Sequence, residues 1–205
     1  MVLNGKADES EANSALELVD SGKGISCPGT PRVVSVVSSV IERAIQKNES
    51  LLQASKKKDV VTTFHGSRVP SLSIRQYIER IFKYSSCSPS CFVVAYIYID
   101  RFLQQLNAYL TSLNAHRLLI TSIMIAAKFI DDECYNNAYF AKIGGVSTAE
   151  MNRLEISFLF TLEFRLHVTA EVFRKYCLHL EKGAAEYENI SPTQSEKGWL
   201  NKDEN

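Results

Sequence analysis

The side chains best suited to chemistry belong to five cysteines and four histidines. Cys87 and Cys91 lie four residues apart, but the sequence supplies no second pair and no nearby histidine to complete a zinc site. Because the cysteines follow no disulfide-framework spacing, we expect free thiols in a reducing compartment. The full set is Cys27, Cys87, Cys91, Cys134 and Cys177, with scattered histidines at His65, His116, His167 and His179.

Three further groups have a chemical interpretation and a simpler structural one. Asp131-Asp132-Glu133 could ligate a cation, but an acidic run at a helix end beside a loop is more often solvated. Gly144-Gly145 lacks the strand-to-helix context of a dinucleotide site, so a turn is favoured. His116 falls in the first turn of an expected helix, where a surface or capping role is favoured over catalysis. The sequence therefore predicts no catalytic residues, no metal and no cofactor.

The composition is that of one globular domain with flexible ends. The chain has 205 residues, of which 45% are hydrophobic, and its formal net charge is zero. Zero net charge gives no electrostatic reason to expect binding to nucleic acid or to anionic lipid. The most apolar run, Leu118–Ala127, is shorter than the roughly 20 residues that cross a bilayer, and no apolar signal segment opens the chain. We therefore expect a soluble intracellular protein.

The pattern of apolar residues divides the chain into four parts. A segment rich in serine, glycine and acids is expected to be disordered, and a helix start at Thr30-Pro31 follows it. From Val33 to Leu52 apolar residues recur at intervals of three and four, which predicts an amphipathic helix. The parts are a disordered segment at 1–29, a helix with a linker at 30–58, a compact domain at 70–182 and a flexible tail at 183–205.

The sequence of the compact domain predicts helices and no strand. Ser73 with Gln76, and Ser147 with Glu150, have the spacing of a capping box. Leu118–Ala127 is apolar nearly all round, which is typical of a helix at the centre of a bundle. Other helix starts are expected at Ser88-Pro89, Asn114, Asn136 and Thr169. The predicted fold class is all-α, a five-helix bundle around the third helix with one extra helix before it.

Several segments resemble the cyclin box. Tyr98–Leu103, which reads Tyr-Ile-Asp-Arg-Phe-Leu, resembles the second-helix signature of cyclins. Ala126–Phe129, followed by an acidic stretch, resembles the end of their third helix, and Leu154-Glu155 with Leu159 and Phe164 resembles their fifth-helix region. The order, spacing and helical placement of these short matches are specific together, although each match alone is not.

A narrower resemblance points to one subgroup. Tyr135-Asn136-Asn137 with Tyr139, then Ala141–Val146, together with His116-Arg117-Leu118, looks like the P-type (or U-type) cyclins of plants, relatives of the yeast phosphate-signalling cyclin. The likeness covers roughly residues 33–182. It implies a single cyclin box whose function is to bind and activate a cyclin-dependent kinase, with no enzymatic activity of its own.

The resemblance also implies which residues bind the kinase. Lys128 and Glu155 match the pair that hydrogen-bonds the kinase backbone. The apolar contacts around them match Ile125, Phe129, Phe164 and Leu166. From residue types alone, Lys128 could simply extend its ammonium into water and Glu155 could be an ordinary surface residue, while Phe164 and Leu166 could belong to the core.

The sequence departs from typical cell-cycle cyclins at the first helix of the box. Those proteins carry an arginine there that pairs with the aspartate of the second helix, and the matching position here is near Ser71. Asp100 therefore needs another partner, and Arg75, a backbone cap and water are the alternatives. We expect structural roles for Asp100 and for the glycines Gly144 and Gly145.

Thr30-Pro31 and Ser191-Pro192 are minimal sites for a proline-directed kinase, although a helix cap explains Thr30 better. The competing function is that of a transcription-factor-type or scaffold cyclin-box module without a kinase partner. Such modules usually have two boxes and a basic face, which a neutral single-box chain lacks. We expect a cyclin-dependent kinase as partner, with no small-molecule substrate, nucleic acid or membrane, in the nucleus and/or cytoplasm.

Overall fold

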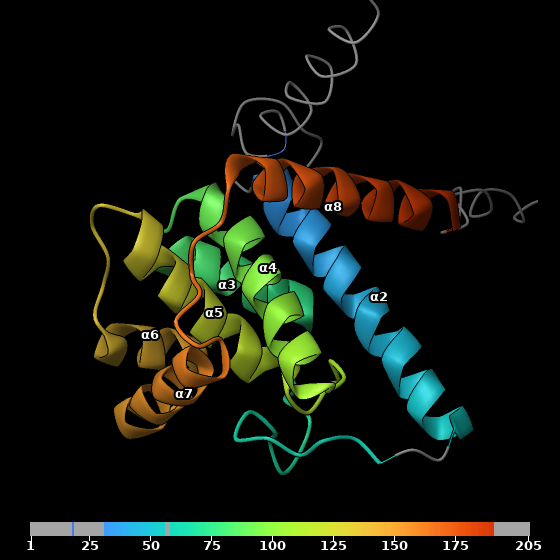
Figure 1. Cartoon of the computed structure of the whole chain (residues 1–205), viewed down its shortest axis with the longest axis horizontal. Helices are drawn as coiled ribbons and strands as arrows, with labels where there is room; N and C mark the ends of the chain where they lie inside the picture. Colours follow the sequence, from blue (N-terminus) through green and yellow to red (C-terminus); the bar gives the residue numbers. More distant parts are fainter. Residues whose placement is uncertain (1–17, 19–30, 56–57, 191–205) are drawn as a thin grey trace, which may run out of the picture.

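A computed structural model of the chain describes Leu18 and residues 31–55 and 58–190, and every regular element in those residues is an α-helix (Figure 1). This confirms the predicted all-α class. The helices are α2 Arg32–Ser55, α3 Ile74–Ser85, α4 Pro89–Leu106, α5 Ala115–Ile130, α6 Asn137–Gly144, α7 Thr148–Thr161 and α8 Ala170–Ile190.

Helix α5 is the centre of the bundle, as its apolar sequence predicts. From Leu118 to Ala127 every residue of this helix is buried, and α3, α4, α6 and α7 pack around it. Ser122 lies within this run, and its hydroxyl donates to the carbonyl of Leu119 at 3.1 Å. A buried polar group that finds such a local acceptor avoids an unpaired hydrogen-bonding group.

The predicted helix starts are present, but their side chains do more than cap. Ser73 and Gln76 form a complete capping box at the start of α3. Ser147 accepts a hydrogen bond from the backbone N–H of Glu150, as a cap should. The Glu150 carboxylate, however, does not close the box, because it pairs with the guanidinium of Arg117 on α5 at 2.7 Å. The second cap thus also joins α7 to the central helix.

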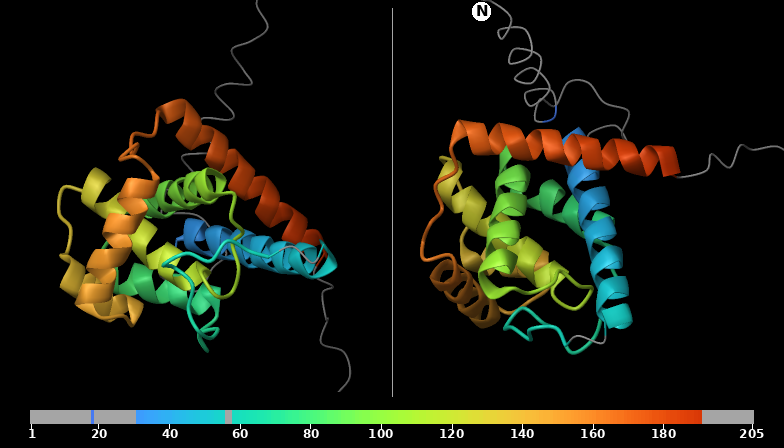
Figure 2. Two further views of the ribbon diagram at one scale, coloured as in Figure 1. Left: turned by 60° about the horizontal axis from the view of Figure 1, so that its bottom comes forward. Right: turned by 45° about the vertical axis from the view of Figure 1, so that its right-hand side comes forward.

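Helices α2 and α8 lie outside the five-helix bundle formed by α3–α7. Helix α2 packs on α3 and α4, and α8 lies across α2 while also contacting α4 (Figures 1 and 2). The predicted boundary at residue 182 falls inside α8, which continues to Ile190. Ala184, Ala185 and Glu186 are strong helix formers, so the polar composition that suggested an end does not stop the helix.

The predicted disordered segment at 1–29 lies outside the described residues except for Leu18. That residue is helical and fully buried in the core cluster.

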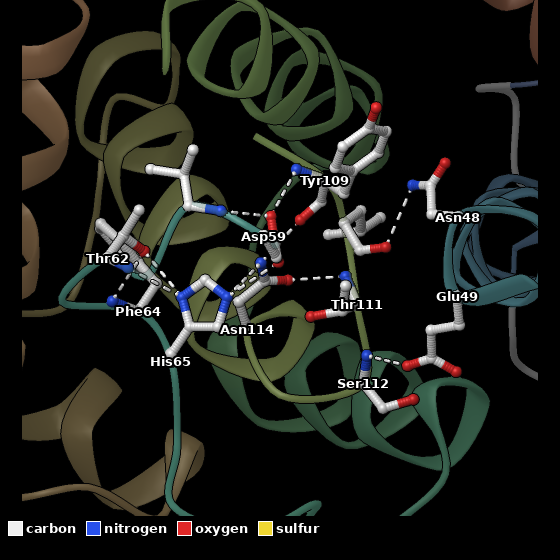
Figure 3. A network of polar contacts seen from close by, with 12 residues as sticks. Asn48, Glu49, Asp59, Thr62, Phe64, His65, Tyr109, Thr111, Ser112 and Asn114 are labelled. Atoms are coloured by element: carbon white, nitrogen blue, oxygen red, sulfur yellow. Dashed lines mark hydrogen bonds and ion pairs between the residues drawn. The ribbon is translucent and has the colours of Figure 1, made fainter. Parts of the chain in front are cut away.

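A polar network fastens the segment after α2 to the bundle (Figure 3). The ring of His65 binds the Asp59 carboxylate through Nε2 at 3.2 Å, while its Nδ1 accepts from the backbone N–H of Thr62 at 3.0 Å. Asp59 in turn accepts from the backbone of Tyr109 at 3.3 Å. These contacts close the long connection between α2 and α3 against the loop before α5.

Asn114 belongs to the same network and corrects one detail of the sequence prediction. It occupies the N-cap position of α5, yet its side chain makes no cap hydrogen bond. Instead its amide accepts from Thr111 N–H at 2.9 Å and donates to the Tyr109 carbonyl at 2.8 Å (Figure 3). Asn48 and Glu49 of α2 bind the same loop, at Leu110 O and Ser112 N. The loop thus joins α2 to α5.

Candidate functional site

Residues 98–103, on α4, form hydrogen bonds with the backbone of the linker that follows α7. The hydroxyl of Tyr98 donates to the Leu166 carbonyl at 2.7 Å. Arg101 donates to the carbonyls of Arg165 and His167 at 3.0 and 3.2 Å. These bonds hold the 165–168 linker against α4 and so determine where α8 begins.

Asp100 finds its partners on α8 and on its own helix. The Tyr176 hydroxyl donates to its carboxylate at 2.5 Å, and the side-chain amide of Gln104 donates at 2.8 Å. Burial, followed by the hydrogen bond to Asp100, raises the pKa of Tyr176 above its ordinary value. Arg75, one of the alternatives, pairs with Glu79 instead. The structural role of Asp100 is therefore to attach the final helix to the box.

The two residues expected to bind a kinase backbone meet on one surface. Lys128 lies in the last turn of α5 and Glu155 in the middle of α7, with Nζ and Oε1 2.6 Å apart. Asn137, the first residue of α6, completes a triangle: its Oδ1 accepts from Lys128 at 2.5 Å, and its Nδ2 donates to Glu155 Oε2 at 2.6 Å. Its Nδ2 also donates to Asn152 Oδ1 at 2.7 Å. Sequence reasoning missed Asn137 as part of this cluster.

Exposed aromatic side chains lie close along the chain to this cluster. Phe129 follows Lys128 and is 50% exposed, and Phe164 beyond α7 is 56% exposed. Ile156 and Phe160, which sequence reasoning did not single out, are 54% and 66% exposed on α7. Since Ile156 and Phe160 lie one helical turn apart, they form a row beside Glu155.

The backbone after α7 turns so that Phe164 projects outward. Glu163 and Phe164 both have positive φ, at 51° and 56°, although neither is a glycine. The left-handed conformation costs a non-glycine residue about 1–2 kcal/mol. Hydrogen bonds from the N–H groups of Glu163 and Phe164 to Phe160 O and Leu159 O, both at 3.0 Å, hold this turn. The ring of Phe164 then meets Phe160 edge-on, with centroids 5.4 Å apart.

Two of the expected apolar contacts are not freely exposed. Ile125 is 2% exposed and belongs to the core, so its side chain packs α5 and does not form part of the surface. Leu166 is partly buried and packs against the core as well. Ile125 lies only three residues before Lys128, but its side chain packs in the core while the long Lys128 side chain reaches the surface.

The two glycines have different structural roles. Gly145 has φ of +71° at the end of α6, a conformation that glycine adopts without strain. Gly144 is a packing position, because a Cβ there would lie 2.8 Å from Ile120 Cγ1. Its carbonyl also accepts from the Tyr77 hydroxyl at 3.1 Å. Gly145 thus ends α6, and Gly144 allows α6 to pack closely on α5.

The side chain of His116 forms a contact within the fold and does not simply face solvent. Its Nε2 donates to the Leu72 carbonyl at 2.8 Å, which holds the segment before α3. Burial lowers the pKa of His116 below its ordinary value. The neutral ring is therefore the favoured form in the folded protein.

Side chains from two segments that are distant in the sequence meet where α4 begins and α5 ends. The Cys91 thiol donates to Asp131 Oδ2 at 3.1 Å, and the Ser88 hydroxyl donates to Asp131 Oδ1 at 2.6 Å. Cys87 lies beside them, with its Sγ within 4.8 Å of the other ligand-type atoms. Asp131 is thus not merely part of a solvated acidic run.

The candidate phosphorylation sites Thr30 and Ser191 lie outside the described residues. Among the helices that the structure describes, none is both long and apolar enough to cross a membrane.

Comparison with known proteins agrees with this architecture. The family model for cyclins matches residues 31–166, which takes in α2 through α7 and the Lys128–Glu155 pair. The chain belongs to the cyclin family.

Similar cyclins come from two plants. Cyclin-P3-1 of Oryza sativa subsp. japonica is 59% identical over 152 residues, which cover 74% of this cyclin and 64% of the rice protein. Cyclin-U1-1 of Arabidopsis thaliana is 50% identical over 155 residues, covering 75% and 74% of the two chains, and Cyclin-P4-1 of rice is also 50% identical, covering 74% and 73%. This cyclin thus matches slightly less than two thirds of Cyclin-P3-1, and the predicted P-type and U-type resemblance is confirmed.

Proposed function

We propose that this cyclin is a regulatory subunit that binds a cyclin-dependent kinase and activates it, in cell-division or phosphate and nutrient signalling, in the nucleus and/or cytoplasm. The observation that carries the proposal is a hydrogen-bonded cluster of Lys128, Asn137 and Glu155 with exposed aromatic residues next to it in the chain. The kinase would contact the end of α5 and the outer face of α7.

The cluster is suited to recognising another backbone because it keeps unused hydrogen-bonding capacity. An ammonium has three donors, and Lys128 uses two of them within the cluster. Each oxygen of Glu155 accepts one internal bond and retains a second lone pair. The internal bonds also fix both long side chains before binding, so less side-chain entropy is lost when a partner arrives.

The Lys128 ammonium keeps contact with water, since its side chain is 35% exposed, whereas Glu155 is only 15% exposed. An ion pair on a protein surface typically contributes only about 0–1 kcal/mol to folding. The aromatic residues offer the larger energy, since buried aromatic anchors dominate most protein interfaces. Phe129, Phe160 and Phe164 are each at least half exposed, so a partner that covers them removes much apolar surface from water.

Capture of a kinase by purified protein tests this proposal. The parent is expected to retain a cyclin-dependent kinase from a panel and to raise its phosphorylation of a histone-type substrate. Lys128→Ala with Glu155→Ala should weaken capture at least about tenfold, since hydrogen bonds to charged groups contribute about 1.5–3 kcal/mol each. Circular dichroism should show unchanged helix content.

The matched control is Arg75→Ala with Glu79→Ala, which removes an exposed ion pair from α3. This control should bind the kinase as the parent does. Equal capture by the Lys128/Glu155 variant would refute the site, and a parent that captures no kinase in the panel would favour the scaffold or transcription-factor function.

A further inference from the structure

Two thiols and one carboxylate gather in a small space at the base of α4. Cys91 is fully buried in the first turn of α4, Cys87 is almost as buried just before it, and Asp131 is half-buried at the end of α5. One ligand-type atom from each lies within 4.8 Å of the others. Because the carboxylate comes from a residue 40 positions after Cys91, only the fold assembles this set.

The geometry is close to that of a tetrahedral zinc site. Zinc binds thiolate sulfur at about 2.3 Å and carboxylate oxygen at about 2.0–2.2 Å, so neighbouring ligand atoms lie roughly 3.5–3.8 Å apart. Cys91 Sγ and Asp131 Oδ2 are already 3.1 Å apart. The largest separation, within 4.8 Å, requires a contraction of only about 1 Å to reach that spacing.

The surroundings orient the carboxylate beside Cys91. The Ser88 hydroxyl holds Asp131 Oδ1 at 2.6 Å, and the Ser88 backbone N–H holds Oδ2 at 3.1 Å, on the side of Cys91 Sγ. Such a hydrogen bond is a typical outer contact of a metal ligand.

A fourth ligand is within reach in the loop that follows α5. Cys134 lies three residues after Asp131 in a segment without regular structure, and its side chain is exposed. Three residues of extended chain span at most about 10 Å, so the backbones of Cys134 and Asp131 are no farther apart than that. The Cys134 thiol donates to the Tyr135 carbonyl at 3.2 Å, and it would leave that contact to join the cluster. The two pairs then have the spacing Cys-x3-Cys and Asp-x2-Cys, and the second pair contains no histidine and only one cysteine.

We propose that Cys87, Cys91 and Asp131 bind one zinc ion, with Cys134 as the fourth ligand. Each cysteine releases its thiol proton to water when its sulfur binds the metal. The ion would fix the loop between α5 and α6 and thereby the start of α6. The inference does not depend on kinase binding, since it rests on the ligand set alone.

Titration of the full-length protein with cobalt(II) tests the site, because tetrahedral cobalt bound to thiolates absorbs visible and near-ultraviolet light. After reduction and removal of metal, the parent should bind one equivalent with both absorption bands, and zinc should displace the cobalt. Cys87→Ser and Cys91→Ser should each weaken binding at least about 100-fold, because loss of an outer partner alone weakens metal binding about 10–100-fold and a direct ligand contributes more. The matched control is Cys177→Ser, a buried cysteine of α8 outside the cluster, which should bind as the parent does.

Asp131→Asn and Cys134→Ser keep the test decisive if the buried cysteine variants fail to fold. Both should weaken cobalt binding, and the thiolate band should fall in Cys134→Ser. A parent without a thiolate-to-cobalt band would overturn the proposal, and so would full binding by the Asp131 variant. An unchanged band in Cys134→Ser would remove that residue from the ligand set.

Discussion

Phe158 and Phe160 lie two residues apart on α7 and have opposite surroundings. Phe158 is fully buried, and its ring stacks on Phe102 of α4 with centroids 4.8 Å apart and planes at 6°. Phe160 is 66% exposed and touches another exposed ring, that of Phe164. The two phenylalanines therefore have different roles. Phe158 joins the helices of the box, whereas Phe160 leaves apolar surface uncovered on the proposed kinase-binding face.

The buried side of α7 should be the more costly to disturb. Phe158→Ala removes a ring that packs against both Phe102 and Phe64, so the free energy of unfolding should fall by about 3–5 kcal/mol. Urea denaturation followed by circular dichroism measures this loss. A loss below about 1 kcal/mol would mean that the stack is not part of the energetic core.

The contact between Asp100 and α8 should have an intermediate effect. Tyr176→Phe removes only the hydroxyl that donates to Asp100, while Gln104 still binds the carboxylate. The free energy of unfolding should fall by about 1 kcal/mol, the usual contribution of one such hydrogen bond. Tyr109→Phe is a suitable comparison, since only its backbone N–H takes part in the Asp59 contact.

Substitution on the exposed side of α7 should have the smallest effect on stability and the largest effect on kinase binding. Phe160→Ala should change the free energy of unfolding by no more than about 0.5 kcal/mol, because the ring is largely in water. Kinase capture should nevertheless weaken by roughly tenfold or more, as expected for an aromatic anchor. Val61→Ala, at an even more exposed apolar side chain after α2, serves as the control for capture. A destabilised Phe160 variant with normal capture would reverse the comparison.

Helix order and the central position of α5 follow from local rules that the sequence obeys. Ser73 with Gln76 forms the predicted capping box. The nearly unbroken apolar run of α5 has no polar side that could face solvent. Capping boxes and apolar runs involve residues that are close together in the sequence. They therefore predict helices whatever the tertiary arrangement is. The partners of Asp100 were not predictable, because Tyr176 lies on a helix that the box signature does not include.

The exposed ring of Phe160 was missed for a related reason. Helix α7 has apolar residues on more than one side, with Met151, Leu154 and Phe158 buried and Ile156 and Phe160 exposed. A periodic pattern shows which residues share a side of a helix, but not which side the rest of the protein covers. Ile125 was expected at the surface but is buried, because it lies on the part of α5 that the neighbouring helices enclose.

The sequence by itself determined the all-α class, the order of the helices and most of their starts, because caps and apolar periodicity are local properties of the chain. The resemblance of several short motifs, in order and spacing, indicated the kinship with cyclins. Only the tertiary structure decided that Asn137 joins Lys128 to Glu155, that Tyr176 holds Asp100, and that Asp131 meets Cys87 and Cys91. Each of these contacts joins separate helices or the loops beside them, and their relative placement is set by how whole helix faces pack together.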